Sequence, residues 1–253
     1  MSRSFQVDSL TVRLYESRAE LGKHAAARAG EKLRDLLRRT ETVNIIFAAA
    51  PSQNEFLASL ATEAGIDWKR VRAFHMDEYT GLPDHAPQRF GNFLKSAFFD
   101  VVPLREVHYL QGNSSDLVNE CRRYAELLVR FPAHIVFMGI GENTHIAFND
   151  PHVARFNDPE MVKVVDLDEA CRQQQVNDGC FKTINDVPRN ALSLTIPALM
   201  KAEQVFCMVP GKMKANAIRH TLRDTIAEKY PSTILRTHPS AELFIDSDSG
   251  ALL

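Results

Sequence analysis

Two adjacent carboxylates, Asp77 and Glu78, follow a short apolar run that ends at Met76. Carboxylates rarely occupy a protein core without a partner, so this pair belongs either to a solvated turn or to a reaction site. In a reaction site, one of them would act as a general base, because a carboxylate can take up and return a proton within hydrogen-bond reach. The sequence leaves both interpretations open at this segment.

A histidine, His145, lies between Asn143 and Asp150 in a polar segment that follows a second apolar run. A histidine with such neighbours is typical of an oriented acid/base group. A metal site made from His145, Asp150 and His152 is an alternative, although this spacing matches no standard ligand set. The glycines of the segment do not form a dinucleotide fingerprint, because the third glycine is missing and the segment lies in mid-chain.

Two further segments suit a phosphate group. Ser52 follows three alanines and a proline, and a helix that begins there would offer free N–H groups and the positive end of its dipole. Ser52 and Glu55 also form a capping-box pattern, which needs no ligand. Lys212 and Lys214 lie near the start of another predicted helix, where the positive end of the helix dipole disfavours positive side chains. A bound anion would offset this repulsion. Two solvated lysines are the alternative.

The pattern of the whole chain predicts an α/β scaffold that brings these segments together. Short apolar runs alternate with amphipathic stretches, which favours a mostly parallel, doubly wound, Rossmann-like sheet with helices on both faces. In such a sheet ligands bind beyond the carboxyl ends of the strands, where all four segments would lie. We expect helices at 17–39, 52–64, 88–98, 115–130 and 212–222, and strands at 42–47, 71–76, 134–139, 161–165, 204–209 and 242–245.

Length and composition favour a single domain over residues 1–253. The chain has 45% hydrophobic residues, enough for a large core, and its formal net charge of −2 provides no basic field for nucleic acid. No run of about 18 apolar residues predicts a membrane span, and the N-terminus lacks the apolar core of a signal peptide. None of the four cysteines forms a C-x-x-C pair, so we expect no zinc or redox site and a cytoplasmic location with free thiols.

Taken together, these segments resemble the glucosamine-6-phosphate deaminase/isomerase family. The matching stretches are 74–79, 139–151 and 211–215, with a weaker match at 232–238, and they follow in order over most of the chain. The run His-Ile-Ala-Phe-Asn-Asp-Pro at 145–151 is the most specific of them. The 6-phosphogluconolactonases are similar in fold, but they lack that run after the histidine.

The resemblance implies an aldose–ketose isomerisation coupled to loss of ammonia from C2 of glucosamine 6-phosphate, which yields fructose 6-phosphate without a cofactor. It implies that Asp77 carries a proton between C1 and C2. It also implies that His145 opens the sugar ring, with Asp150 orienting it, and Asn143 can hydrogen-bond the same imidazole. Lys214 would contact the phosphate.

The other expected substrate contacts are Ser52, Glu78 and Arg172. The expected partner is a small sugar phosphate rather than nucleic acid or a membrane, and the sequence does not decide between a monomer and a homo-oligomer. Galactosamine 6-phosphate is a rival substrate. A 6-phosphogluconolactonase, which would need His145 but not Asp77, and a non-catalytic sugar-phosphate sensor are the alternative functions.

The chain departs from the family pattern at four places. Asn143 stands where the family usually has aspartate, and Asp150 stands where it usually has glutamate. The family's glycine-rich phosphate loop is replaced by 48–52, and its phosphate-binding arginine by the stretch 179–181. Asn143 can hydrogen-bond an imidazole but cannot stabilise imidazolium by charge, so we expect slower ring opening or a different preferred sugar. This substitution is also the best sequence evidence for a sensor.

Overall fold

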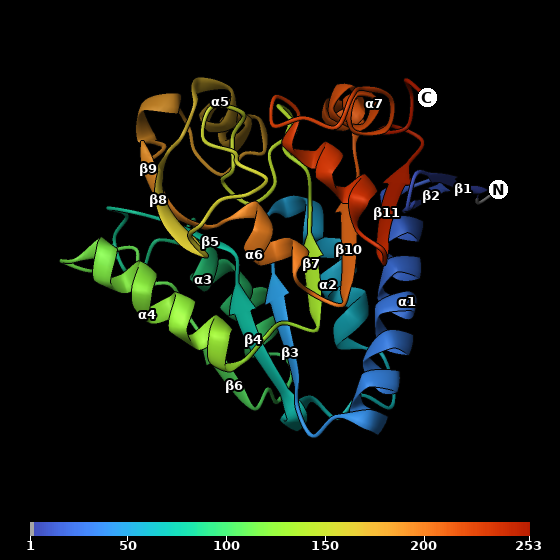
Figure 1. Cartoon of the computed structure of the whole chain (residues 1–253), viewed down its shortest axis with the longest axis horizontal. Helices are drawn as coiled ribbons and strands as arrows, with labels where there is room; N and C mark the ends of the chain where they lie inside the picture. The colour runs from blue at the N-terminus through green and yellow to red at the C-terminus, as the bar shows by residue number, and fades with distance from the viewer. Residues whose placement is uncertain (1–2) are drawn as a thin grey trace.

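The fold is described for residues 3–253 by a computed structural model (Figure 1). The helices are α1 (Arg18–Arg39), α2 (Asn54–Ala61), α3 (Phe90–Leu94), α4 (Leu117–Arg130), α5 (Glu169–Asn177), α6 (Ile196–Met200) and α7 (Ala215–Arg223). The strands are β1 (Arg3–Val7), β2 (Leu10–Tyr15), β3 (Val43–Phe47), β4 (Val71–His75), β5 (Asp77–Tyr79), β6 (Glu106–His108), β7 (Ile135–Met138), β8 (Val162–Asp166), β9 (Asn190–Leu194), β10 (Gln204–Val209) and β11 (Ala241–Asp246).

The main sheet of the described chain has the strand order β1-β2-β11-β10-β7-β3-β4-β6. Every neighbouring pair in it is parallel except β1 with β2, which confirms the prediction of a mostly parallel sheet. The chain passes outward from β3 through β4 to β6, and then returns to β7 on the other side of β3. The strand order therefore reverses between β3 and β7, and a ligand crevice is expected at the carboxyl ends of these two strands.

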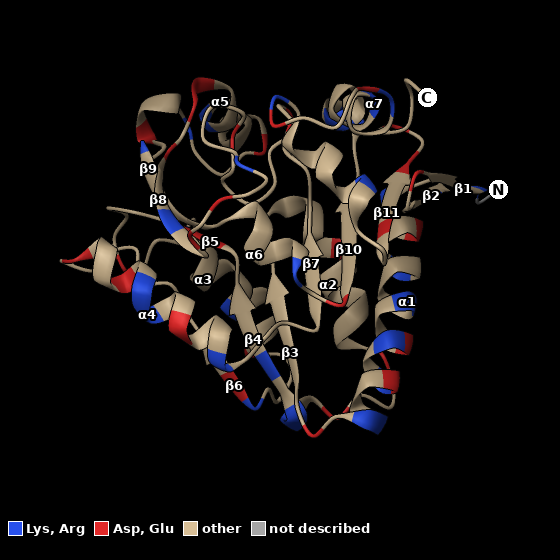
Figure 2. Cartoon of the chain, viewed as in Figure 1, with Lys and Arg blue, Asp and Glu red and all other residues tan. Residues whose placement is uncertain are grey.

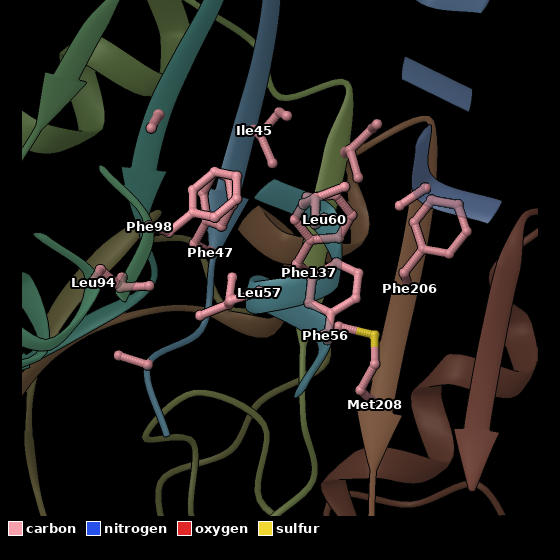
Figure 3. Packing of buried hydrophobic residues seen from close by; sticks show 14 of the residues in the cluster. Ile45, Phe47, Phe56, Leu57, Leu60, Leu94, Phe98, Phe137, Phe206 and Met208 are labelled. Atoms are coloured by element: carbon pink, nitrogen blue, oxygen red, sulfur yellow. The ribbon is translucent and has the colours of Figure 1, made fainter. Parts of the chain in front are cut away.

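Helices cover both faces of the main sheet, which explains why its central strands are apolar throughout. Along β3, Ile45 and Phe47 face a core shared with α1, α2 and α3, whereas Ile46 faces a second core shared with α4, α6 and α7. Figure 3 shows the first core, where Phe56 of α2 packs with its ring centroid 4.8 Å from that of Phe137 on β7. The doubly wound arrangement is thus confirmed.

Helix α1 shows how local sequence fixes an element of this scaffold. It begins after Ser17, whose hydroxyl accepts a hydrogen bond from the Glu20 N–H and so satisfies one of the free donors of the first turn. Gly22 lets α1 approach α2 closely, because an added Cβ would lie 2.7 Å from the Glu55 Cβ. Acidic and basic residues are interspersed on the outer sides of α1 and α4 (Figure 2), as on solvated helix faces. Among the described helices none is long and apolar enough to cross a membrane.

The structure corrects several sequence-based expectations. The strand expected at 161–165 exists as β8, but it lies in a separate antiparallel sheet of order β5-β9-β8. The segment between β7 and β8 contains no helix, whereas parallel neighbours are usually joined through one. The helix expected at 88–98 is shorter as α3 and continues as a π-helix over Lys95–Phe99. The sequence analysis missed β1, β2, β5, β6, β9, α5 and α6.

Candidate active site

A cleft opens at the carboxyl ends of β3 and β7, where the strand order reverses, with α5 and α7 beside that edge of the sheet (Figure 1). Its walls include Ser52 from the loop after β3, Asp77 after β4, His145 after β7 and Lys214 after β10. The cleft has about 480 Å³ of space outside protein atoms, which includes space open to solvent, and apolar residues line it together with a few polar side chains, as in small-molecule sites. Residues far apart in the sequence thus meet around a space suited to a small ligand.

Asp77 is buried at the start of β5, and its Oδ1 has no hydrogen-bond partner within residues 3–253. Burial, and then the charge of Glu78, raise the pKa of the Asp77 carboxyl well above its ordinary value. His75 fixes the backbone at this point, because its Nε2 accepts from the Leu110 N–H and its Nδ1 donates to the Asp77 carbonyl oxygen over 2.8 Å. The result is a held carboxyl group with an unused oxygen, as proton transfer requires.

His145 is oriented by two side chains on one side of its ring. Its Nδ1 lies 2.7 Å from the Asn143 Oδ1 and 3.1 Å from the Asp150 Oδ1, so an Nδ1–H proton can be shared between these oxygens. The other ring nitrogen, Nε2, makes no hydrogen bond within the described chain and is available to a ligand. Burial opposes charge on Asp150, but the contacts with His145, Asn143 and the Asp168 N–H together lower the pKa of Asp150. The carboxylate form of Asp150 is therefore favoured beside the imidazole.

The loop that carries His145 folds tightly beneath the ring. Thr144 and Ala147 have φ angles of 72° and 48°, in the left-handed region that non-glycine residues rarely adopt. Thr144 is held in place by its carbonyl oxygen, which accepts a hydrogen bond from the Ser232 N–H. A Cβ added to Gly141 would lie 2.1 Å from the His145 Cε1, so glycine is required at this position to make room for the ring.

We expect Gly141→Ala to displace His145 and to lower the activity of the site about a hundredfold, because misplacement by about 1 Å can cost that much. Steady-state kinetics would measure the loss. Gly81→Ala is the matched control, since an added Cβ there meets nothing within 4 Å although the φ angle of 79° is strained. The control should lose some stability and keep its activity. Equal activity losses in the two variants would contradict this account.

Lys214 ends a short 3₁₀ turn after β10 and is only 6% exposed. Its ammonium group makes no hydrogen bond or ion pair within residues 3–253. Burial lowers the pKa of Lys214, although the charges of Asp178, Glu142 and Cys171 act in the opposite direction. A buried cation without a partner at the wall of a cleft favours binding of an anion, as a phosphate site requires.

Ser52 also lines the cleft, where its Oγ accepts a hydrogen bond from the Gln53 Nε2 over 3.2 Å. The capping box expected from Ser52 and Glu55 does not form. The Glu55 carboxylate instead pairs with the Arg18 guanidinium over 2.6 Å, and no side chain caps α2. The hydroxyl of Ser52 therefore remains able to contact a ligand.

Two expected substrate contacts lie outside this cleft, which corrects their expected place. The Glu78 carboxylate accepts hydrogen bonds from the Phe90 and Gly91 N–H groups at the start of α3. The Arg172 guanidinium donates to the carbonyl oxygens of Ile184 and Val187. Both side chains use their hydrogen-bonding capacity within the fold.

The alternative metal set of His145, Asp150 and His152 does not assemble in the described chain. His152 approaches Asp150 together with Asp168, whereas His145 approaches Asp150 together with Cys171. Hydrogen bonds already use both oxygens of the shared residue, Asp150. His145 and His152 therefore do not join Asp150 in one group of potential ligands.

The sequence analysis missed polar residues of the cleft that come from two helical segments, namely Gln53, Gln174 and Gln175. Gln53 donates from Nε2 to the Met208 carbonyl oxygen, and its buried Oε1 has no partner within residues 3–253. Gln174 accepts a hydrogen bond from the Glu142 N–H over 2.7 Å and so fastens the His145 loop to α5. The run of three glutamines at 173–175, next to Arg172, is the sequence signal that could have indicated polar cleft residues here.

Comparisons with known proteins point to one family. Residues 16–244 match the family described as glucosamine-6-phosphate isomerases/6-phosphogluconolactonase. A protein named glucosamine-6-phosphate deaminase from Bacillus cereus (strain B4264) is 33% identical over 227 residues, which cover 89% of this chain and 84% of that protein. A protein of the same name from Bacillus thuringiensis (strain Al Hakam) is 32% identical with the same coverage.

Solved structures agree with the fold. A monomeric glucosamine-6-phosphate deaminase of the NagB superfamily matches with a TM-score of 0.86 and 26% identity, over 96% of this chain and 99% of that one. The 6-phosphogluconolactonase from Thermotoga maritima matches with a TM-score of 0.75 and 20% identity, over 94% of this chain and 99% of that one. The second match, at this identity, bears on the fold alone.

Proposed function

The chain belongs to the glucosamine-6-phosphate isomerase/6-phosphogluconolactonase family, and from that premise we propose that it converts glucosamine 6-phosphate and water to fructose 6-phosphate and ammonia. It is an enzyme, as its relatives are, and not a non-catalytic sensor. The observation that carries the proposal is the buried Asp77 carboxyl, which has an unpartnered Oδ1 and lines the same cleft as His145 and Lys214.

In the proposed reaction, Lys214 and Ser52 hold the phosphate at one end of the cleft. The free Nε2 of His145 moves the proton of the C1 hydroxyl to the ring oxygen, which opens the sugar and leaves an aldehyde at C1. Asp77 then removes the proton from C2 and returns it to C1. When C2 loses its proton, the C2–H electron pair forms a C1=C2 double bond, and the aldehyde oxygen takes a proton from the ammonium group of the substrate, which gives an enolamine. When the proton returns to C1, the nitrogen lone pair forms a C2–nitrogen double bond. Water then adds to C2, and ammonia leaves to give the ketone.

The raised pKa of Asp77 suits this task, because a general base acts best when its pKa lies close to the working pH. A lactonase would hydrolyse an ester bond without proton transfer between carbons. In that reaction His145 would have a role, but the buried carboxyl of Asp77 would have none. We therefore favour the deaminase over the lactonase.

A panel of hexosamine 6-phosphates with ammonia detection tests this proposal, with 6-phosphogluconolactone assayed beside it. We expect ammonia and fructose 6-phosphate from glucosamine 6-phosphate, and no lactone hydrolysis above the uncatalysed rate. The galactosamine epimer tests the sugar preference. Enzymatic lactone hydrolysis without ammonia release from any amino sugar would overturn the proposal.

A further inference from the structure

The amide of Asn143 is the centre of a network behind His145. Its Nδ2 donates to the Asp150 Oδ1 over 2.9 Å and to the Asp168 Oδ2 over 3.0 Å. Its Oδ1 accepts from the His145 backbone N–H and lies 2.7 Å from the His145 Nδ1. Turning the amide over would place its oxygen against two carboxylates. The two carboxylates therefore fix the orientation in which the oxygen faces the imidazole.

Asp168 is held rigidly in this network without touching the imidazole. It is the N-cap of α5, where its Oδ1 accepts from the Cys171 N–H over 2.6 Å. Its own backbone N–H donates to the Asp150 Oδ2 over 3.1 Å. Asp168 thus contacts both Asn143 and Asp150, the two side chains that orient His145.

The charges of the network explain why an amide occupies position 143. An aspartate there would place three carboxylates next to one another, and like charges at such distances strongly disfavour ionisation of all three. The amide avoids this repulsion by donating one hydrogen bond to each neighbouring carboxylate. The negative charge that Asn143 lacks is present one contact further from the ring, on Asp168.

We propose that Asp168 is a positioning residue for His145, which fixes the Asn143 amide and supplies the second negative charge of the histidine network. The contacts support this coupling independently of the substrate, but the effect on turnover rests on the proposed function. Positions 143 and 168 therefore form a coupled pair, in which the effect of changing one side chain depends on the other.

A charge-exchange cycle tests the pair through the variants Asp168→Asn, Asn143→Asp and the double variant. Asparagine is a good N-cap, so Asp168→Asn keeps the cap of α5 while it sets two amide donors against each other. Each single variant should lower kcat about tenfold or more, with little change in KM, as expected for coupled neighbours. The double variant should recover part of the lost kcat, because the carboxylate at 143 would again face an amide at 168, while its repulsion from the Asp150 carboxylate would remain.

Asp116→Asn is the matched control, because Asp116 caps α4 in the same way, by accepting from the Asn119 N–H, and lies outside the cleft. Its kcat should not change. The free energy of unfolding is measured for the same variants and should show the same pattern of recovery. This measurement reports the contact between the two side chains without depending on the reaction. If the wild type releases no ammonia, the proposed function fails while the unfolding cycle still tests the pair. Additive losses in the double variant, in kcat or in stability, would overturn the inference.

Discussion

Replacing Asp77 with asparagine should abolish ammonia release, with a fall in kcat of about a thousandfold, in the range that a positioned general base contributes. Asparagine keeps the size of the side chain but cannot accept the proton of C2 at its uncharged nitrogen. KM should change far less than kcat, because Lys214 and Ser52 still hold the phosphate. Coupled detection of ammonia and fructose 6-phosphate measures both parameters.

The same substitution should not weaken the fold at neutral pH. Folding raises the pKa of Asp77 above its unfolded value, so the folded chain disfavours the charged form. The contribution of this pKa difference to the free energy of unfolding is therefore fully present below the unfolded pKa. It is lost as the pH rises through the folded pKa. Relative to the wild type, Asp77→Asn should gain stability between pH 4, near the unfolded pKa, and pH 7. Denaturant unfolding at the two pH values measures this difference.

Glu78→Gln is the control for Asp77→Asn, because it changes the adjacent carboxylate of the same strand. Glu78 accepts three backbone hydrogen bonds near α3 and lies outside the cleft. The variant should lose about 1–3 kcal/mol of stability through weakened acceptors and keep kcat within a few-fold. If Glu78→Gln lost kcat a thousandfold while Asp77→Asn stayed active, the base would be Glu78 and not Asp77.

Replacing Lys214 with methionine should raise KM for the sugar phosphate about tenfold to a hundredfold, because a hydrogen bond to a charged group contributes about 1.5–3 kcal/mol. The fall in kcat should be smaller, since the phosphate lies away from the reacting carbons. Inorganic phosphate should stabilise the wild type against heat and should not stabilise the variant. Kinetics and thermal unfolding with and without phosphate measure these effects.

Without a ligand, Lys214→Met should be more stable than the wild type at neutral pH. Burial lowers the folded pKa of Lys214, so folding disfavours its charged form, and this cost shrinks as the pH rises toward the ordinary lysine value. Lys212→Met is the matched control, because Lys212 lies in the same turn and is exposed. Equal changes of KM in the two variants would contradict a phosphate site at Lys214.

The sequence predicted the parts of this protein that periodicity and strand-end chemistry determine. The strand Gln204–Val209 was expected with the bounds that the structure gives it, because it is buried on both faces and reads as one apolar run. Ser52, Asp77, His145 and Lys214 were expected from the loops that follow strands, and the fold brings them to one cleft. A parallel sheet gathers such loops at one edge, so the type of a residue and its place after a strand together predicted which side chains would meet.

The remaining expectations failed where tertiary contacts decide the outcome. Asp77 and Glu78 are adjacent in β5, and successive side chains of a strand point to opposite faces, so only one of them enters the cleft. The segment was expected to be a loop after a strand, where this alternation does not apply. The sequence alone did not point to Asp168 either. Its proposed role depends on its hydrogen bond with Asn143, and Asn143 lies 25 positions away in the chain.

The most direct test of the account follows the bond between C2 and its hydrogen. Glucosamine 6-phosphate that carries deuterium at C2 is incubated with the wild type and with Asp77→Asn, and NMR follows the deuterium. The account predicts that the wild type releases ammonium and breaks the C2–deuterium bond, with part of the label at C1 of fructose 6-phosphate. It predicts that the label stays at C2 of unconverted substrate in the variant. Loss of the label from C2 at equal rates in both proteins would contradict the assignment of Asp77.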